Sequence, residues 1–260
     1  MLALTACELI PEAERFIPVP YDTEAPAERA HLLIDYTGFR CVNCPTAAET
    51  AHAMQALYGD LLVIVSMHPA SNPFTQGKYD YTCPEADECY TYMGGTASTP
   101  FPTGNIDILP DETGYFIEPA EWAARFNSLR ETTEAPVLSV EATEDSPSGP
   151  VTVTATMFAG TTTDCRLAIW LTEDSIQGVQ AMPDGSVNMN YYHRHVLRAA
   201  AEDGLWGSPL TIGNAEQKNT LSLTIPDGCV REHCAVVALL LDATDRHVLQ
   251  VKQTSIQLQQ

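Results

Sequence analysis

The chain has 260 residues, 45% of them hydrophobic, so it is long enough for two domains with substantial cores. Thirteen basic residues against 34 acidic ones give a formal net charge of -21. Such a surface repels phosphate backbones, which excludes nucleic acid as an expected partner. The sequence has no apolar stretch of about 18 residues, so we expect no membrane-spanning helix.

The N-terminus resembles the start of a bacterial lipoprotein. Leu4-Thr5-Ala6-Cys7 matches the pattern at which such proteins are cleaved and lipidated on cysteine. The three residues before it are too few for the apolar region of a signal peptide and include no Lys or Arg, so either the start is mis-set or the match is accidental. The acidic, proline-containing segment that follows favours a mis-set start. We therefore predict that residues 1–28 are a signal remnant and tether, with Cys7 as the lipidation site.

The next feature is a pair of cysteines, Cys41 and Cys44, separated by two residues. An apolar run precedes the pair, and a helical pattern starts at Pro45. A dithiol at a strand-to-helix turn is typical of thioredoxin-like folds, because the helix N-terminus favours the thiolate that attacks disulfides. The same spacing also occurs in zinc sites and local structural bridges. Zinc needs four ligands, and no second pair with this spacing is present. Eight cysteines in one chain also suggest an oxidising compartment.

Apolar periodicity predicts an α/β thioredoxin-like domain over residues 29–131. Two buried strands flank a helix in a βαβ unit, and a strand, a turn, a second strand and a helix follow. An irregular insertion at residues 69–98 interrupts the order, and its Cys83 and Cys89 are a candidate structural disulfide. The predicted strands cover residues 30–36, 61–67 and 105–109, and the predicted helices cover 45–58 and 118–130.

The pattern changes after a linker at residues 131–136. Residues 151–157 and 221–225 alternate between apolar and polar side chains, and further short strands are separated by Pro, Gly and Asp turns. This pattern predicts an all-β antiparallel sandwich domain over residues 137–260. The expected fold is therefore an α/β thioredoxin-like domain followed by a β-sandwich.

Two further residues could act with the dithiol. Asp35, within the first strand, could take a proton from Cys44, and burial would raise its pKa. The alternative is an exposed aspartate at the strand end. Pro102 precedes a strand where thioredoxin-like folds place a cis-proline that positions an extended substrate. Pro100 is a rival for this role, and an ordinary turn proline is the alternative.

Three histidines are weaker candidates. His68, at the end of the second strand, could face the dithiol or have a structural role at the loop. His193 and His195 lie two residues apart, so they share one face of a strand. This spacing permits metal binding, but no third ligand is fixed, and a surface or packing role is favoured.

Several segments together carry a resemblance to one family: Leu32-Leu33-Ile34-Asp35-Tyr36-Thr37-Gly38 running into Cys41-Val42-Asn43-Cys44-Pro45, Phe101-Pro102-Thr103-Gly104, Trp170-Leu171-Thr172-Glu173-Asp174, Tyr192-His193-Arg194-His195-Val196-Leu197-Arg198 and Leu205-Trp206-Gly207. They resemble the thioredoxin-like outer-membrane lipoproteins named after a twenty-eight-kilodalton outer membrane protein. The resemblance implies a thioredoxin-like domain followed by a β-sandwich, tethered by lipid to the outer membrane of a Gram-negative anaerobe. Arg40 replaces the tryptophan that precedes the first cysteine in thioredoxin, and Val42-Asn43 replaces its Gly-Pro.

Two functions follow. In the first, the protein is an envelope thiol-disulfide oxidoreductase acting on protein thiols or disulfides, with Cys41 as a partly exposed nucleophile, Cys44 as the resolving thiol, Asp35 as proton acceptor and Pro102 positioning the substrate. In the second, it is a non-enzymatic module whose Cys41–Cys44 bridge is structural and whose sandwich binds an envelope or surface partner. Neither function calls for a cofactor, and both place the chain at the outer membrane.

Overall fold

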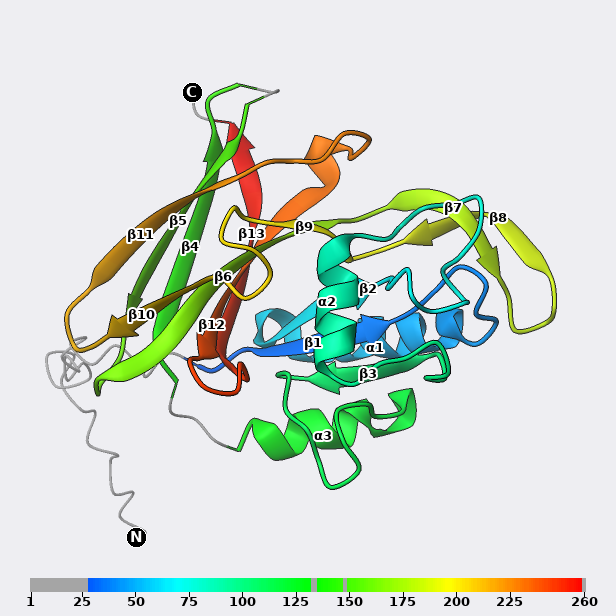
Figure 1. Ribbon diagram of the computed structural model, residues 1–260, viewed down its shortest axis with the longest axis horizontal. Coiled ribbons are helices and arrows are strands. Elements are labelled where there is room, and N and C mark those ends of the chain that lie inside the picture. Colours follow the sequence, from blue (N-terminus) through cyan, green and yellow to red (C-terminus); the bar gives the residue numbers. More distant parts are fainter. Residues whose placement is uncertain (1–27, 132–134, 147–148, 259–260) are drawn as a thin grey trace, which may run out of the picture.

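The computed structural model describes residues 28–131, 135–146 and 149–258 (Figure 1). The predicted lipidation site Cys7 and nearly all of the predicted tether lie outside these residues. No helix in the described ranges is long and apolar enough to cross a membrane.

The N-terminal half contains β1 (His31–Tyr36), α1 (Cys44–Tyr58), β2 (Leu62–Met67), α2 (Pro84–Tyr92), β3 (Thr103–Ile106) and α3 (Trp122–Leu129). The C-terminal half contains β4 (Val137–Glu144), β5 (Val151–Phe158), β6 (Thr163–Glu173), β7 (Ile176–Ala181), β8 (Val187–His193), β9 (Val196–Ala200), β10 (Ser208–Ile212), β11 (Gln217–Leu223), β12 (Cys234–Asp242) and β13 (Val248–Leu258).

One sheet runs through both halves. Its strands follow the order β11-β5-β4-β13-β12-β6-β9-β2-β1-β3, and β10 pairs with β6 beside this path. β1 is parallel to β2 and antiparallel to β3, so Asp35 lies opposite Ser66 and Gly104. β9 joins the two halves, because Val196 pairs with Ser66 of β2 while the strand also pairs with β6. β7 and β8 form a hairpin outside this sheet.

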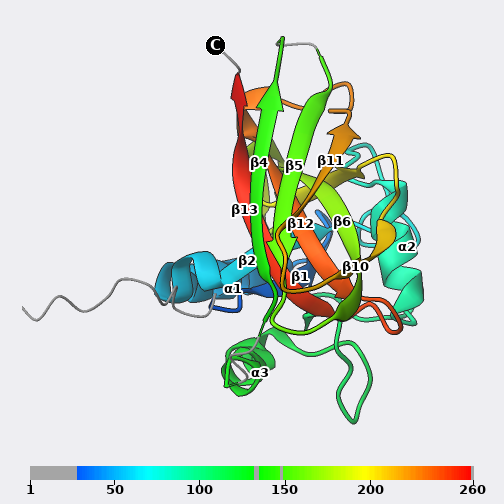
Figure 2. The same cartoon turned by 90° about the vertical axis from the view of Figure 1, so that its left-hand side faces the viewer.

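Helices cover both faces of the sheet around β1 and β2. Figure 2 shows α1 and α2 on opposite sides of these strands. Leu33 of β1 packs in one apolar cluster with residues of α1 and α3, and Leu32 and Ile34 pack in another with residues of α2. The alternation follows from the two-residue period of a strand. β1 is buried along its whole length, as the apolar run predicted.

The β-rich character predicted for residues 137–260 is confirmed, but the strands do not form a free-standing sandwich. Strands β4, β5, β6, β11 and β12 enclose an apolar core of their own, to which Val153, Ile169 and Val236 contribute. The same sheet then continues through β9 into the N-terminal half. Strand periodicity identifies a buried face without identifying the partner strand, so the sequence could not show this continuity. The predicted division of the chain at residues 131–137 stays a prediction.

The predicted irregular insertion at residues 69–98 contains helix α2. Its proline in the first turn, followed by Glu85 and Asp87, is a helix-start signal that the prediction missed. The disulfide predicted between Cys83 and Cys89 is not formed. Cys83 is the N-cap residue and Cys89 lies more than one turn along the helix, so their side chains point to different neighbours. The Cys83 thiol donates to the Leu197 carbonyl, and the Cys89 sulfur accepts from the Tyr36 hydroxyl.

The second strand predicted after residues 110–114 is reduced to a bridge. Ile117 exchanges two backbone hydrogen bonds with Gly104 of β3, and no longer pairing follows. The first predicted strand of this region is displaced, covering Thr103–Ile106 rather than residues 105–109. Asp107 and Ile108 end it because both have positive φ angles, 59° and 55°, which no strand can contain.

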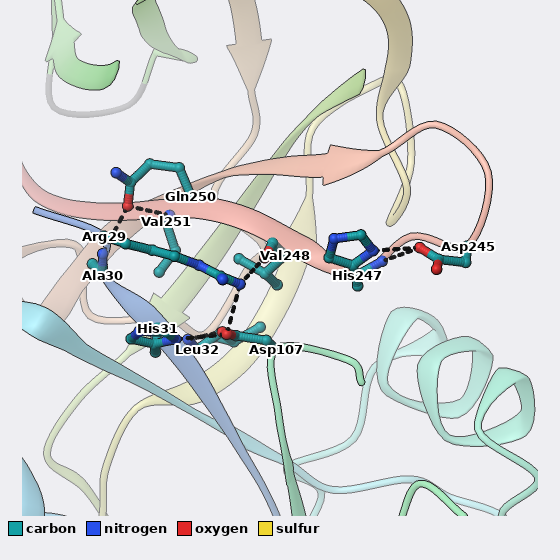
Figure 3. Close-up of polar contacts among 10 residues, drawn as sticks. All are labelled: Arg29, Ala30, His31, Leu32, Asp107, Asp245, His247, Val248, Gln250 and Val251. Carbon is teal, nitrogen blue, oxygen red and sulfur yellow. Dashed lines mark hydrogen bonds and ion pairs between the residues drawn. The ribbon is translucent and has the colours of Figure 1, made fainter. Parts of the chain in front are cut away.

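A buried carboxylate fastens the end of β3 to β1 and β13 (Figure 3). Asp107 accepts hydrogen bonds from Arg29 Nη2 at 3.0 Å and from the Leu32 amide at 2.9 Å, and its Oδ2 lies 2.6 Å from His31 Nδ1. The Val248 amide donates to the Asp107 carbonyl at 2.8 Å, and Arg29 donates to the Val248 carbonyl at 2.7 Å. Asp107 therefore holds β1 through its carboxylate and β13 through its backbone carbonyl, and Arg29 links the two.

Asp107→Ala is expected to lower the free energy of unfolding by about 3–5 kcal/mol, because the variant leaves buried donors and a buried charge without their partner. Urea unfolding followed by circular dichroism measures the change. Asp245→Ala is the matched control, since Asp245 pairs with His247 but its side chain is 61% exposed, and it should cost less than about 1 kcal/mol. Equal effects of the two variants would contradict the anchoring role of Asp107.

Candidate functional site

The predicted dithiol lies where β1 gives way to α1. Cys41 and Cys44 are joined in a disulfide with their Cα atoms 5.4 Å apart. The Cys41 amide donates to the Gly38 carbonyl, which tightens the turn, and Cys44 is the first residue of α1. Pro45 then occupies the first helical turn, where its missing N–H has no intrahelical partner to lose. The local arrangement of strand, dithiol and helix is as the sequence predicted.

The disulfide is sealed, and the prediction that Cys41 is partly exposed is wrong. Cys41 is 1% exposed and Cys44 is 2% exposed. Hairpin β7–β8, which Figure 1 shows reaching from the C-terminal half to the N-terminal half, is bonded to the turn that carries them. Gln180 Nε2 of β7 donates to the Cys41 carbonyl at 2.8 Å and to the Gly38 carbonyl at 3.3 Å. The Ala181 amide adds a bond of 2.8 Å to the carbonyl of Phe39.

Asp35 is buried beside the disulfide, so the alternative of an exposed aspartate is wrong. Its carboxyl lines a cavity that also includes Cys44, Ser66 and Gln180. Burial raises the pKa of Asp35 from 3.8 to about 7, and within the described ranges its Oδ1 has no hydrogen-bond partner. The cavity measures about 20 Å³. This is room for about one water molecule and excludes a peptide or a cofactor.

Buried histidines complete the lining of the cavity. Burial lowers the pKa of His68 well below 6.5, and neither ring nitrogen of His68 meets a hydrogen-bond partner among the described residues. Burial also lowers the pKa of His193 to about 4, while its Nε2 donates to the Val179 carbonyl at 3.2 Å. His195 lines the same cavity. These residues were visible in the sequence as isolated histidines, but no sequence signal pointed to Gln180.

The other predicted residues fall around the turn. The Phe101–Pro102 peptide bond is cis, as predicted for Pro102 rather than Pro100. Phe101 belongs to the same buried apolar cluster as Cys41 and Cys44. Arg40, which precedes Cys41, has an exposed side chain that donates to the Gln76 carbonyl at 3.3 Å.

One group of metal-ligand type lies in the part of the chain that the structure describes. Asp242, Asp245 and His247 have ligand atoms within 4.8 Å of one another. Asp242 is engaged in capping the turn that follows it, since its Oδ1 accepts from the amides of Thr244 and Asp245. The group therefore has a structural explanation, and His193 and His195 are not part of it.

Comparison with known proteins identifies the family. Residues 88–260 match the model of the family described as outer membrane protein Omp28, which is more than half of the chain. The chain belongs to the Omp28 family. The family resemblance seen in the sequence is thereby confirmed, and so is the expected location at the outer membrane. No curated protein matches this Omp28-family chain significantly.

Two solved structures share the fold of this Omp28-family protein. HBP35 of Porphyromonas gingivalis superposes with a TM-score of 0.67 and 15% identity, covering 88% of this chain and 76% of its own. A structural-genomics protein from Agrobacterium tumefaciens gives a TM-score of 0.56 and 14% identity, covering 89% of this chain and 96% of its own. A domain of the outer membrane lipoprotein Omp28 from Porphyromonas gingivalis is 20% identical over 49% of this chain and 92% of its own, with a TM-score of 0.36.

The raised pKa of Asp35 predicts how stability depends on pH. The folded carboxyl keeps its proton up to about pH 7, whereas the unfolded one loses it near pH 4, so stability falls as pH rises between these values. At 1.36 kcal/mol per unit, the full loss is on the order of 4 kcal/mol. Asp35→Asn is expected to remove most of this loss between pH 5 and pH 8, as measured by urea unfolding. The exposed Asp203→Asn serves as control, and an unchanged pH profile in Asp35→Asn would contradict the assignment.

Proposed function

We propose that this Omp28-family protein is a lipid-anchored, non-enzymatic module of the outer membrane in which Cys41–Cys44 is a permanent structural crosslink. The sealing of both cysteines carries the proposal. Disulfide exchange requires an attacking thiolate to reach one of the two sulfurs, and both cysteines are at most 2% exposed. The cavity beneath is too small to admit one.

The crosslink has a structural role in the turn. Closing a loop this short contributes roughly 2 kcal/mol by restricting the unfolded chain. The bridge also fixes the carbonyls of Gly38 and Cys41, to which Gln180 of the hairpin is bonded. A fixed turn therefore holds β7 and β8 against the N-terminal half.

Anchoring and partner choice belong to the same proposal. Cys7 would carry the lipid, and residues 8–28 would form the tether. Tyr81 and Tyr90 of the 69–98 segment are buried and pack the segment onto the core, so they do not form a binding surface. Exposed apolar side chains lie instead on hairpin strand β8, where Val187, Met189 and Tyr192 face solvent. Such residues suit contact with a protein, a glycan or a neighbouring envelope component.

The proposal predicts an inert disulfide in the folded protein. After treatment with dithiothreitol, Cys41 and Cys44 are expected to label with iodoacetamide only once the chain is unfolded in urea. Insulin reduction by the full chain should not exceed that of the Cys41→Ser, Cys44→Ser double variant. Labelling of Cys41 ahead of Cys44 under native conditions, with insulin turnover lost in Cys41→Ser, would overturn the proposal.

A second candidate function is thiol-disulfide exchange by a thioredoxin-like site that the hairpin gates. The observation that favours it is Asp35, since an unpartnered buried carboxyl beside Cys44 is costly and a permanent crosslink has no use for it. In this mechanism the Cys41 thiolate attacks the substrate disulfide, and Asp35 accepts the proton of Cys44 as Cys44 resolves the mixed disulfide. Pro102 would position the substrate.

Opening the hairpin separates the two candidates. Gln180→Ala removes the hydrogen bonds from β7 to the Gly38 and Cys41 carbonyls. If the site is gated, insulin reduction should rise at least about tenfold and should fall again when Asp35→Asn is added. If the crosslink is permanent, insulin reduction by both variants should stay at the wild-type level. Gln177→Ala is the matched control, because Gln177 lies on the same strand but its side chain is exposed and bonds only Asn190.

A further inference from the structure

A second pair of thiols lies at the start of β12, on the other side of β9 from the Cys41–Cys44 disulfide. Cys229 and Cys234 flank the short 3-10 turn Arg231–His233. The two thiols interact, since each shifts the pKa of the other. Cys234 is buried and its thiol donates to the Val230 carbonyl at 3.4 Å, whereas Cys229 is partly exposed. The Cys229 thiol can therefore be reached from solvent, whereas the Cys234 thiol is buried next to it.

Two charged residues from neighbouring strands hold this pair in place. Arg198 of β9 donates from Nε to the Cys229 sulfur at 3.3 Å. The same guanidinium forms an ion pair at 3.3 Å with Glu173 of β6, which is buried. Glu173 also accepts from the Val230 amide at 2.7 Å, next to Cys229 in the chain. The Arg198–Glu173 ion pair therefore holds both the loop that carries Cys229 and the guanidinium that faces the Cys229 sulfur.

The electrostatics assign different roles to the two thiols. The hydrogen bond from the Cys234 thiol, followed by the hydrogen bond and charge of Arg198, lowers the pKa of Cys229 to about 7. The same hydrogen bond and burial raise the pKa of Cys234. A thiol with a pKa near the ambient pH is the best attacking nucleophile, because it combines a high thiolate fraction with good intrinsic reactivity.

The remaining free thiols offer a contrast. Cys83, Cys89 and Cys165 are all buried, and burial raises their pKa values to about 12, 12 and 11. None of them has a cation bonded to its sulfur among the interactions that the structure describes. Cys229 is thus the one free thiol of the described residues that is both reachable and ionisable near neutral pH.

We propose that Cys229 and Cys234 form a second dithiol that reduces disulfides of proteins or of low-molecular-weight thiols. The Cys229 thiolate attacks one sulfur of the external disulfide, whose S–S bond breaks and releases a thiolate. Cys234 then attacks the Cys229 sulfur of the mixed disulfide and passes its proton to the second departing sulfur. Two electrons have moved from the chain to the external disulfide, which becomes two thiols, while Cys229 and Cys234 become joined.

Glutathione disulfide is the probe for this dithiol. The full chain is reduced, freed of reductant and exposed to the probe at pH 7, and peptide mapping follows each cysteine. The wild type should gain a Cys229–Cys234 bridge with two glutathione thiols released per bridge formed. Cys234→Ser should stop at a stable glutathione adduct on Cys229, and Cys229→Ser should show neither product. Mapping separates these products from Cys41 and Cys44, so the result is independent of the function proposed for that disulfide.

Arg198 supplies a second readout as a positioning residue. Arg198→Gln should slow the reaction of Cys229 at pH 7 about tenfold and move the midpoint of its pH profile upward, while Arg198→Lys should keep most of the rate. Arg166→Gln is the control, because Arg166 bonds backbone carbonyls and no thiol. Modification of Cys83, Cys89 or Cys165 as fast as that of Cys229, or an unchanged rate in Arg198→Gln, would overturn the proposal.

Discussion

The pairing of β9 with β2 is the constraint on which the rest of the structure depends. The contact is short, a single register pair between Val196 and Ser66 and a bond from the Ser66 amide to the His195 carbonyl. It nevertheless closes the open edge of the N-terminal sheet and extends it into the C-terminal strands. β9 directly follows hairpin β7–β8, so the hairpin must lie beside the end of β1. The same strand carries Arg198 toward Cys229.

The buried carboxylate of Asp107, at the end of β3, stabilises the packing of the N-terminal sheet on its other side. Asp107 has no exposed surface, and its partners come from the segment before β1, from β1 itself and from β13. Such a group adds little net stability compared with an apolar contact, because desolvation offsets most of the attraction. Its value is specificity, since any shift of β3 along β1 would separate the carboxylate from Arg29, His31 and the Leu32 amide.

The two thiol pairs show that cysteine spacing alone does not decide reactivity. Cys41 and Cys44 have the spacing associated with redox sites, yet the hairpin seals them. Cys229 and Cys234 have no recognised spacing, yet one sulfur is reachable and faces a guanidinium. The reactivity of a thiolate depends on its exposure and on the local charge, and both are set by the residues that surround it in the folded structure.

The sequence by itself determined the family, the β-rich C-terminal half and the strand–dithiol–helix order, and it favoured a buried Asp35 and Pro102 over their alternatives. Each of these rests on residues close together in the chain or on a segment pattern, where periodicity and local turns leave few options. Only the tertiary structure decided the sealing of Cys41, the missing Cys83–Cys89 bridge and the environment of Cys229. Gln180 and Cys41 are 139 residues apart, and Arg198 and Cys229 are 31 apart. No local pattern encodes such contacts, because they arise from which strands pair once the sheet has formed.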